Sequence, residues 1–204
     1  MSIEYHVDDL PADVDLGGSV AVDTETLGLN PARDRLCVVQ LSAGDGTCHV
    51  VHFPEARYDA PHLVRLLDDR QVEKIFHFAR FDLAVLKRYL GADCRPVYCT
   101  KIASKLARTY TDRHGLKELC HELLGIDLSK QMQSSDWGAP SLSEAQLAYA
   151  SHDVLHLHAL RARLDQMLQR EGRDHLLQPC LDFLPHRAVL DLAGWPETDI
   201  FAHS

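Results

Sequence analysis

Five residues of this chain have the types and spacing expected of a site that holds divalent metal ions. Asp23 and Glu25 lie two residues apart at the end of an apolar run, so on a strand both side chains would point to the same face. Two carboxylates side by side repel each other unless a cation lies between them. Asp82 follows a second apolar run, and Asp153 comes four residues after Tyr149 in a helical pattern.

Oxygen atoms of carboxylates are the ligands that hard divalent cations prefer. The four acids therefore predict a site for two Mg²⁺ or Mn²⁺ ions about 3.5–4 Å apart, which is the arrangement that hydrolyses a phosphodiester. Tyr149 has an ordinary pKa of about 10 and is a poor base at neutral pH, so we expect it to orient the attacking water. Each acid taken alone is more readily explained as a helix cap or a surface carboxylate. The prediction depends on all four occurring together.

The elements that would position these residues follow from hydrophobic periodicity and turn residues. An α/β fold with a mixed central sheet flanked by helices is predicted, because strands come first and then alternate with helices. Strands are expected over residues 19–25, 35–42, 47–53, 72–78 and 96–99, with a hairpin turn at 44–46. Helices are expected over residues 61–68, 79–90, 100–109, 115–124, 143–171 and 174–184. A spacing of four would place Tyr149 and Asp153 on one face of their helix.

The segments that carry the five residues resemble the three exonuclease motifs of the DEDD superfamily. They are residues 23–25 (DTE), 77–82 (HFARFD) and 149–153 (YASHD). The tyrosine four residues before the last aspartate is similar to the DEDDy branch, which includes ribonuclease D; the histidine branch has His where this chain has Ala148. The resemblance covers roughly residues 18 to 160 and implies an RNase H-like fold. It also implies a metal-dependent 3′-5′ exoribonuclease that releases 5′-mononucleotides.

A narrower resemblance is to the short nano-RNase type C proteins of alphaproteobacteria. It rests on residues 23–29, 99–117, 133–137 and 200–204. Those proteins act on very short RNA such as dinucleotides and assemble as octameric rings, so the resemblance implies short single-stranded RNA as partner and a homo-octamer. Two alternatives stay open. One is a broader 3′-5′ exonuclease on longer RNA or DNA, and the other is a non-catalytic nucleic-acid-binding or interaction module on the same fold.

Residues near the motifs are candidate substrate contacts. Leu29 occupies the place where related oligoribonucleases present a leucine between two bases, and a packed turn residue is the equal alternative. Trp137 is expected either to pack on the fold or to lie beside the site. For Phe78 and Phe81 a core position is favoured, and Arg80 suits a phosphate contact as well as a surface salt bridge. The remaining candidates for substrate binding are Thr26, His77, Phe81, Lys105, Gln133 and Ser135.

Length and charge limit the kind of nucleic acid that would bind. The 204 residues, 46% of them apolar, predict one exonuclease domain over residues 1–204, without the helical nucleic-acid-binding (HRDC) domains that follow the catalytic part of ribonuclease D. A net charge of −9 argues against extensive binding of long nucleic acid. Residues 101–130 hold six basic and four acidic residues, which is +2, so the remainder is −11. These basic residues are either solvated helix faces or partners of substrate phosphates.

The remaining composition predicts a reduced, cytoplasmic protein without a membrane segment. Six cysteines contain no C-x-x-C pair, which argues against zinc or redox chemistry and favours small buried residues. Histidines at 152, 156 and 158 share a predicted helix with Tyr149 and Asp153, but hard cations prefer oxygen ligands. The tail of residues 181–204 is apolar and interrupted by Pro185 and Pro196. It is expected to pack either on its own domain or on a neighbouring subunit, and the ring-forming resemblance favours the second.

Overall fold

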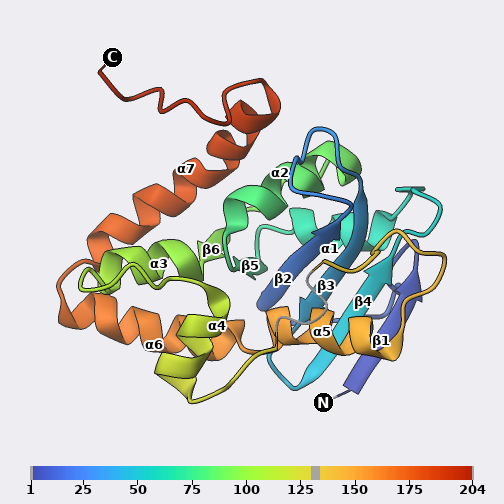
Figure 1. Ribbon diagram of the computed structural model, residues 1–204, viewed down its shortest axis with the longest axis horizontal. Helices are drawn as coiled ribbons and strands as arrows, with labels where there is room; N and C mark the ends of the chain where they lie inside the picture. The colour runs from blue at the N-terminus through green and yellow to red at the C-terminus, as the bar shows by residue number, and fades with distance from the viewer. Residues whose placement is uncertain (1, 130–133, 204) are drawn as a thin grey trace.

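The computed structural model describes residues 2–129 and 134–203, and its centre is a six-stranded sheet (Figure 1). The strand order is β1-β4-β3-β2-β5-β6. The strands are β1 (Ser2–Val7), β2 (Ser19–Thr26), β3 (Leu36–Ser42), β4 (Thr47–His52), β5 (Glu73–Phe76) and β6 (Val97–Cys99). β3 runs antiparallel to β2 and β4, whereas the other neighbouring strands are parallel. The predicted α/β class with a mixed sheet is confirmed.

The burial of each strand bears on whether it was predicted from the sequence. β3 is buried along its whole length, and its residues form a nearly continuous apolar run. The hairpin between β3 and β4 is confirmed, and Gly44 and Gly46 in it take φ values of +81° and +92° that favour glycine. β1 was not predicted. It is an edge strand in which Ile3, Tyr5 and Val7 alternate with polar residues, but Tyr5 and Val7 are exposed, and the strand is defined by its pairing with β4.

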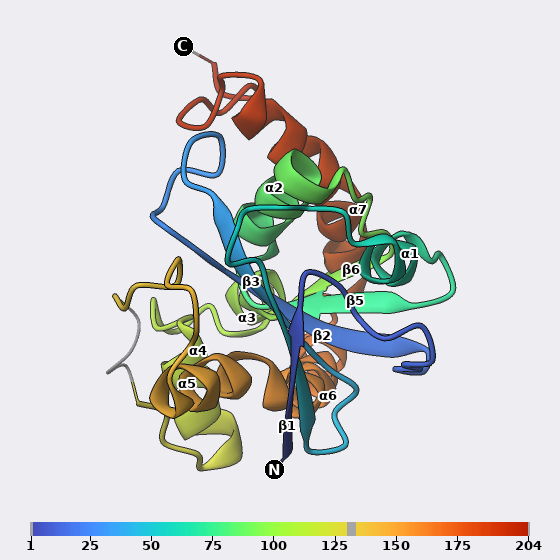
Figure 2. The same ribbon diagram turned by 90° about the vertical axis from the view of Figure 1, so that its right-hand side faces the viewer.

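Helices cover both faces of the sheet. They are α1 (Pro61–Asp68), α2 (Ala79–Leu90), α3 (Thr100–Ala107), α4 (Leu116–Leu119), the π-helical turn η1 (Cys120–Leu124), α5 (Glu144–Leu155), α6 (Leu157–Arg170) and α7 (Asp174–Leu192). α5 packs across β4, β3 and β2, while α2 contacts β2, β5 and α7. In Figure 2, α2 lies above the strands and α5 below them. The strand β2 therefore runs between two helices that belong to opposite layers.

Two helix predictions were wrong in their bounds. The single helix expected over 143–171 is divided at His156, whose ψ of −4° ends α5. The break redirects the chain from the sheet, which α5 covers, to α3, against which α6 packs. The last helix, expected to end at 184, continues through Pro185 to Leu192. Pro185 is buried and the buried face of α7 lies against α2, so packing offsets the hydrogen bond that proline cannot donate.

The predicted burial of the cysteines is confirmed for most of them. Five of the six cysteines are buried as predicted, Cys180 is exposed, and all six are free thiols. In the described part of the chain, no helix combines the length and apolar character needed to cross a membrane.

A buried lysine holds β5 in place, and β5 leads into the second motif. Lys74 is fully buried, and its Nζ donates to three carbonyl oxygens: Asp69 at 2.7 Å, Val72 at 2.6 Å and Arg95 at 2.7 Å. Burial lowers the pKa of Lys74 to about 8. The ammonium therefore ties the turn before β5 to the segment before β6.

We expect Lys74→Met to destabilise the fold by about 2–3 kcal/mol, because three buried carbonyl groups lose their donor. Urea denaturation would measure the change. Lys87→Met is the matched control, since the Lys87 ammonium makes one surface hydrogen bond, to Gly91 O at 3.2 Å, and its loss should cost less than about 0.5 kcal/mol. Equal effects of the two substitutions would contradict a structural role for Lys74.

Candidate active site

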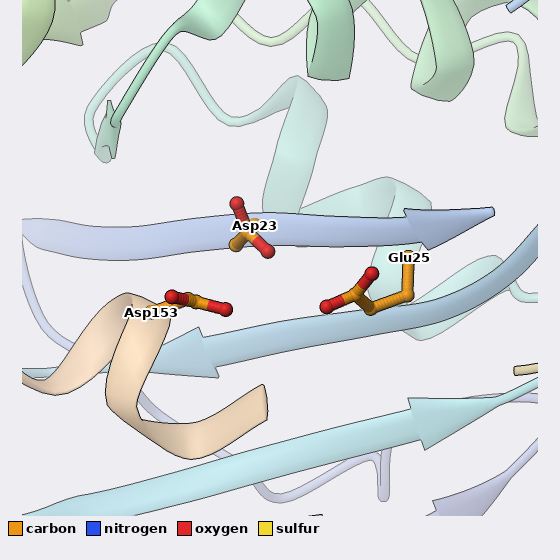
Figure 3. A group of neighbouring side chains, drawn as sticks. All are labelled: Asp23, Glu25 and Asp153. Atoms are coloured by element: carbon orange, nitrogen blue, oxygen red, sulfur yellow. The ribbon is translucent and has the colours of Figure 1, made fainter. Parts of the chain in front are cut away.

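Three of the four predicted acids meet at one place in the structure. Asp23 and Glu25 project from β2, and Asp153 projects from α5 toward them (Figure 3). One carboxylate oxygen from each lies within 4.8 Å of the others. Within residues 2–129 and 134–203, this is the one group of three or more Asp, Glu, His or Cys side chains close enough to share a metal ion. The arrangement follows from strand alternation and the packing of α5 on β2.

Asp82 lies beside the strand β2, which carries Asp23 and Glu25. It lies in the first turn of α2, is 3% exposed, and accepts a hydrogen bond of 2.7 Å from Thr24 Oγ1. Thr24 lies between Asp23 and Glu25, so alternation points its side chain to the opposite face of the strand. Asp82 is not one of the three carboxylates that lie within 4.8 Å of one another, yet it is close enough for its charge to act on both Asp23 and Glu25.

Burial raises the pKa of every acid in this cluster, and repulsion between carboxylates adds to it for Asp23, Glu25 and Asp82. Burial, followed by the charges of Asp153 and Asp82, raises the pKa of Glu25 to about 9. The pKa of Asp23 is also raised well above its ordinary value, chiefly by burial. Burial raises the pKa values of Asp82 and Asp153 to about 7. The cluster consequently retains protons near neutral pH when no cation is bound.

These properties fit a hard divalent cation. The donors are all carboxylate oxygens, and their charges repel one another across a few ångströms. A cation between them would remove both the repulsion and the tendency to hold protons.

Tyr149 lies one turn before Asp153 on α5 and faces the same cleft. Burial, followed by the charge of Asp153, raises the pKa of Tyr149, so its hydroxyl group stays protonated and can donate a hydrogen bond. Its ring lies 6.0 Å from the ring of Trp137, which is buried. The segment around Trp137 is fixed because Arg35 donates to Gly138 O at 3.2 Å and Gln146 donates to Asp136 O at 3.0 Å. Trp137 thus both packs on the fold and lies beside the site.

The acids open into a cleft of about 660 Å³. Six of the predicted substrate contacts line it: Thr26, Leu29, His77, Phe81, Ser135 and Trp137. Leu29 is 91% exposed, which excludes the alternative of a packed turn residue. Lys105 is not among the lining residues, and Gln133 lies outside the described residues.

Several side chains near the second motif differ from expectation. A core position for Phe78 is wrong, because this residue is 45% exposed, takes a left-handed φ of +66°, and lies beneath the Lys101 ammonium at 4.4 Å. Phe81 packs partly against the core and also lines the cleft. Of the two alternatives for Arg80, the structure shows the salt bridge, which its Nε forms with Asp191 Oδ2 at 2.6 Å.

Several further residues line the cleft and were not predicted from the sequence. They are Leu27, Leu116, Glu118, Leu128 and Ser129. Lys117, from the basic segment, lies among them, whereas Arg108 of the same segment is fully buried and paired with Glu122. The approach of α4 to β2 brings these residues together, and no local pattern in the sequence indicates it.

The chain is similar in sequence to known nucleases and to a DNA polymerase. Residues 4–169 match a family described as 3′-5′ exonuclease. The chain is 38% identical to ribonuclease D of Gluconacetobacter diazotrophicus over 154 residues, covering 76% of this chain and 39% of that protein. It is 37% identical to DNA polymerase I of Aquifex aeolicus over 147 residues, covering 72% of this chain and 24% of that protein. The chain thus spans about two fifths or less of these curated relatives.

Solved structures resemble the chain over its full length. Brucella melitensis NrnC bound to pGG superposes with a TM-score of 0.96 and is 60% identical, covering 100% of both chains. The same protein with bound Mg²⁺ gives a TM-score of 0.94 at 58% identity, also over 100% of both. Escherichia coli RNase D gives 0.72 at 23% identity, covering 88% of this chain and 48% of that one. The predicted RNase H-like exonuclease fold is confirmed.

We expect the metal-free protein to become less stable as the pH rises. The acids have pKa values of about 7 (Asp82, Asp153) and about 9 (Glu25) in the folded state, against about 4 in an unfolded chain. The folded state therefore binds more protons, and stability present at low pH is lost between about pH 5 and pH 9. Melting temperatures in a chelator would show this fall, and saturating Mg²⁺ should oppose it.

Asp23→Asn is the control for this measurement. It removes one of the repelling carboxylates, so the metal-free variant should show a shallower fall and a higher melting temperature at alkaline pH. A melting temperature that rises with pH in chelator, or the same slope in the variant, would contradict the assigned repulsion.

Proposed function

This chain belongs to the 3′-5′ exonuclease family, and from that membership we propose that it is specialised for RNA of very few nucleotides. It is a 3′-5′ exoribonuclease of the ribonuclease D and NrnC type. The observation that carries the proposal is the group of three carboxylates, with oxygens within 4.8 Å, at a cleft that an exposed leucine borders. The cleft volume of about 660 Å³ is that of a small-molecule site rather than an extended groove. NrnC of Brucella melitensis, solved with pGG, supports the same size class.

In the proposed mechanism, Asp23, Glu25, Asp82 and Asp153 hold two divalent ions, Mg²⁺ or Mn²⁺. Use of a divalent metal is supported by the family and by the Mg²⁺-bound relative. Such ions supply an activated water and neutralise charge on the leaving oxygen. Thr24 orients Asp82 through its hydrogen bond of 2.7 Å.

Tyr149 and the cleft walls act on the substrate and the water. The protonated hydroxyl group of Tyr149 donates a hydrogen bond that orients the attacking water, and the buried Trp137 fixes its ring. Leu29 projects into the cleft from the loop after β2, where it would contact the bases. Thr26, Phe81 and Ser135 line the same space. Lys105, also predicted to contact substrate, is not among the residues that line the cleft, and Gln133 lies outside the described residues.

We also propose that the 204 residues form one domain and that the protein acts in the cytoplasm. Eight copies of the chain would assemble as a homo-octamer. The tail beyond α7 extends away from the sheet (Figure 1), and Ile200 and Phe201 on it are 45% and 75% exposed. Its first turn is held in place, because Arg187 donates to the carbonyl oxygen of Thr198 at 3.0 Å. A fixed turn that presents apolar side chains is suited to contact a neighbouring subunit.

The proposal is tested by hydrolysis of 5′-labelled RNA of two, three, five and twenty nucleotides with Mg²⁺ or Mn²⁺. We expect rapid cleavage of the dinucleotide and much slower cleavage of the longest RNA. Asp153→Asn should reduce turnover by more than the roughly 100-fold cost of losing a residue that only orients a ligand, while the fold is retained. Similar rates at all lengths, or on matched DNA, would indicate a broad exonuclease, and full activity in Asp153→Asn would contradict the metal site.

Deletion of residues 195–204 should lower the oligomer mass measured by light scattering. These residues include Trp195, Ile200 and Phe201, which are at least 45% exposed. A matched control is His203→Ala in the full-length chain, which changes one exposed polar residue and should leave the mass unchanged. An unchanged mass after the deletion would indicate that the tail packs only on its own domain and does not contribute to the oligomer interface.

A further inference from the structure

The hydrogen bonds around His77 determine which of its ring nitrogens can accept a hydrogen bond. Thr100 Oγ1 carries one proton and donates it to the carbonyl oxygen of Phe76 at 3.2 Å. The contact of 2.9 Å between Thr100 Oγ1 and His77 Nδ1 is therefore a hydrogen bond that the ring donates. With its proton on Nδ1, the neutral ring has a lone pair on Nε2. Among the described residues, Nε2 has no hydrogen-bond partner, and His77 lines the cleft.

The surroundings of His77 keep the ring uncharged. Burial, followed by the nearby charge of Lys101, lowers the pKa of His77 to about 3. The ring consequently presents an acceptor at any pH near neutrality. A phosphate group offers only acceptors at this pH, so it cannot form a hydrogen bond with Nε2. The complementary groups of a nucleotide are the hydroxyl groups of its sugar and the N–H groups of its base.

The position of His77 distinguishes between these two groups. His77 follows β5, which pairs in parallel with β2 up to Ala21 and Ile75. β5 ends at Phe76, so His77 comes directly after the strand, and it lines the same cleft as Asp23 and Asp153, where the phosphodiester would be cleaved. The sugar is the part of a nucleotide directly bonded to that phosphate, and the base lies beyond it.

We propose that His77 Nε2 accepts a hydrogen bond from a ribose hydroxyl group of the 3′-terminal nucleotide and so contributes to selection of RNA. This inference rests on the proposed function and adds the chemical group that His77 recognises. Thr100 acts on the substrate only through His77 and is a positioning residue.

The test compares a ribodinucleotide with its 2′-deoxy and 3′-deoxy forms at the terminal sugar. For His77→Phe, the loss of kcat/KM on the hydroxylated substrate should exceed the loss on one deoxy substrate by about five- to tenfold, which is the value of one hydrogen bond. The deoxy form that shows this difference identifies the hydroxyl group. If the wild-type enzyme is active and His77→Phe lowers kcat/KM equally on all three substrates, the inference about His77 is overturned and the proposed function stands. If the wild-type enzyme leaves every oligoribonucleotide intact, the proposed function fails and the inference falls with it.

A second readout does not depend on turnover. In ¹⁵N-resolved NMR at neutral pH, the His77 ring, identified by its loss in His77→Phe, should carry its proton on Nδ1. A ring protonated on Nε2, or on both nitrogens, would overturn the inference. Thr100→Val should remove this tautomer preference and lower the ratio of ribo- to deoxyribo-dinucleotide hydrolysis in the same direction as His77→Phe. His62→Phe is the matched control, because His62 pairs with Asp9 at 2.8 Å at the start of α1, and it should leave that ratio unchanged.

Discussion

Repulsion among carboxylates in a partly buried site is the constraint on which the rest of this structure depends. Asp23, Glu25 and Asp153 bring oxygens within 4.8 Å of one another, and the nearby Asp82 adds a fourth charge. Without a cation, this arrangement opposes folding, as the raised pKa values of all four groups indicate. The packed core must supply the compensating free energy.

The fold prevents the acids from relieving this repulsion by moving apart. β3 pairs with β2 through Asp23 and Glu25 themselves, and β5 pairs with residues 19–21 on the other side, so the backbone that carries the two acids is fixed. α5 begins at a capping box in which the Ser143 and Gln146 side chains satisfy each other's backbone groups, and it packs across three strands. Asp82 is tied to Thr24 on the face that α2 covers. Separating the acids would require unpacking one of two layers.

The sequence predicts the parts of this arrangement that depend on local periodicity. Alternation is sufficient to place Asp23 and Glu25 on one face, and a spacing of four places Tyr149 with Asp153. The edge strand β1 was missed although Ile3, Tyr5 and Val7 alternate along it, and its pairing with β4 is visible only in the tertiary structure. The break at His156 and the continuation of α7 through Pro185 are also set by the layers against which these helices pack. For the same reason, alternation shows that Thr24 faces away from Asp23, but only tertiary structure shows that Asp82 meets it.

The use of the basic residues gives a physical reason for a preference for short substrates. Arg108 is buried with Glu122, Arg80 is paired with Asp191, and Lys74 binds backbone carbonyl groups. These cations stabilise the fold and are not free to bind phosphates, on a chain whose net charge is already −9. On the proposed function, attraction for RNA then comes from the metal ions at the acids and from contacts inside the cleft. Each further nucleotide would add a negative charge outside that short range, to a chain that is itself negatively charged. Length selection can thus arise from the charge distribution of one subunit, before any constraint that an assembly would add.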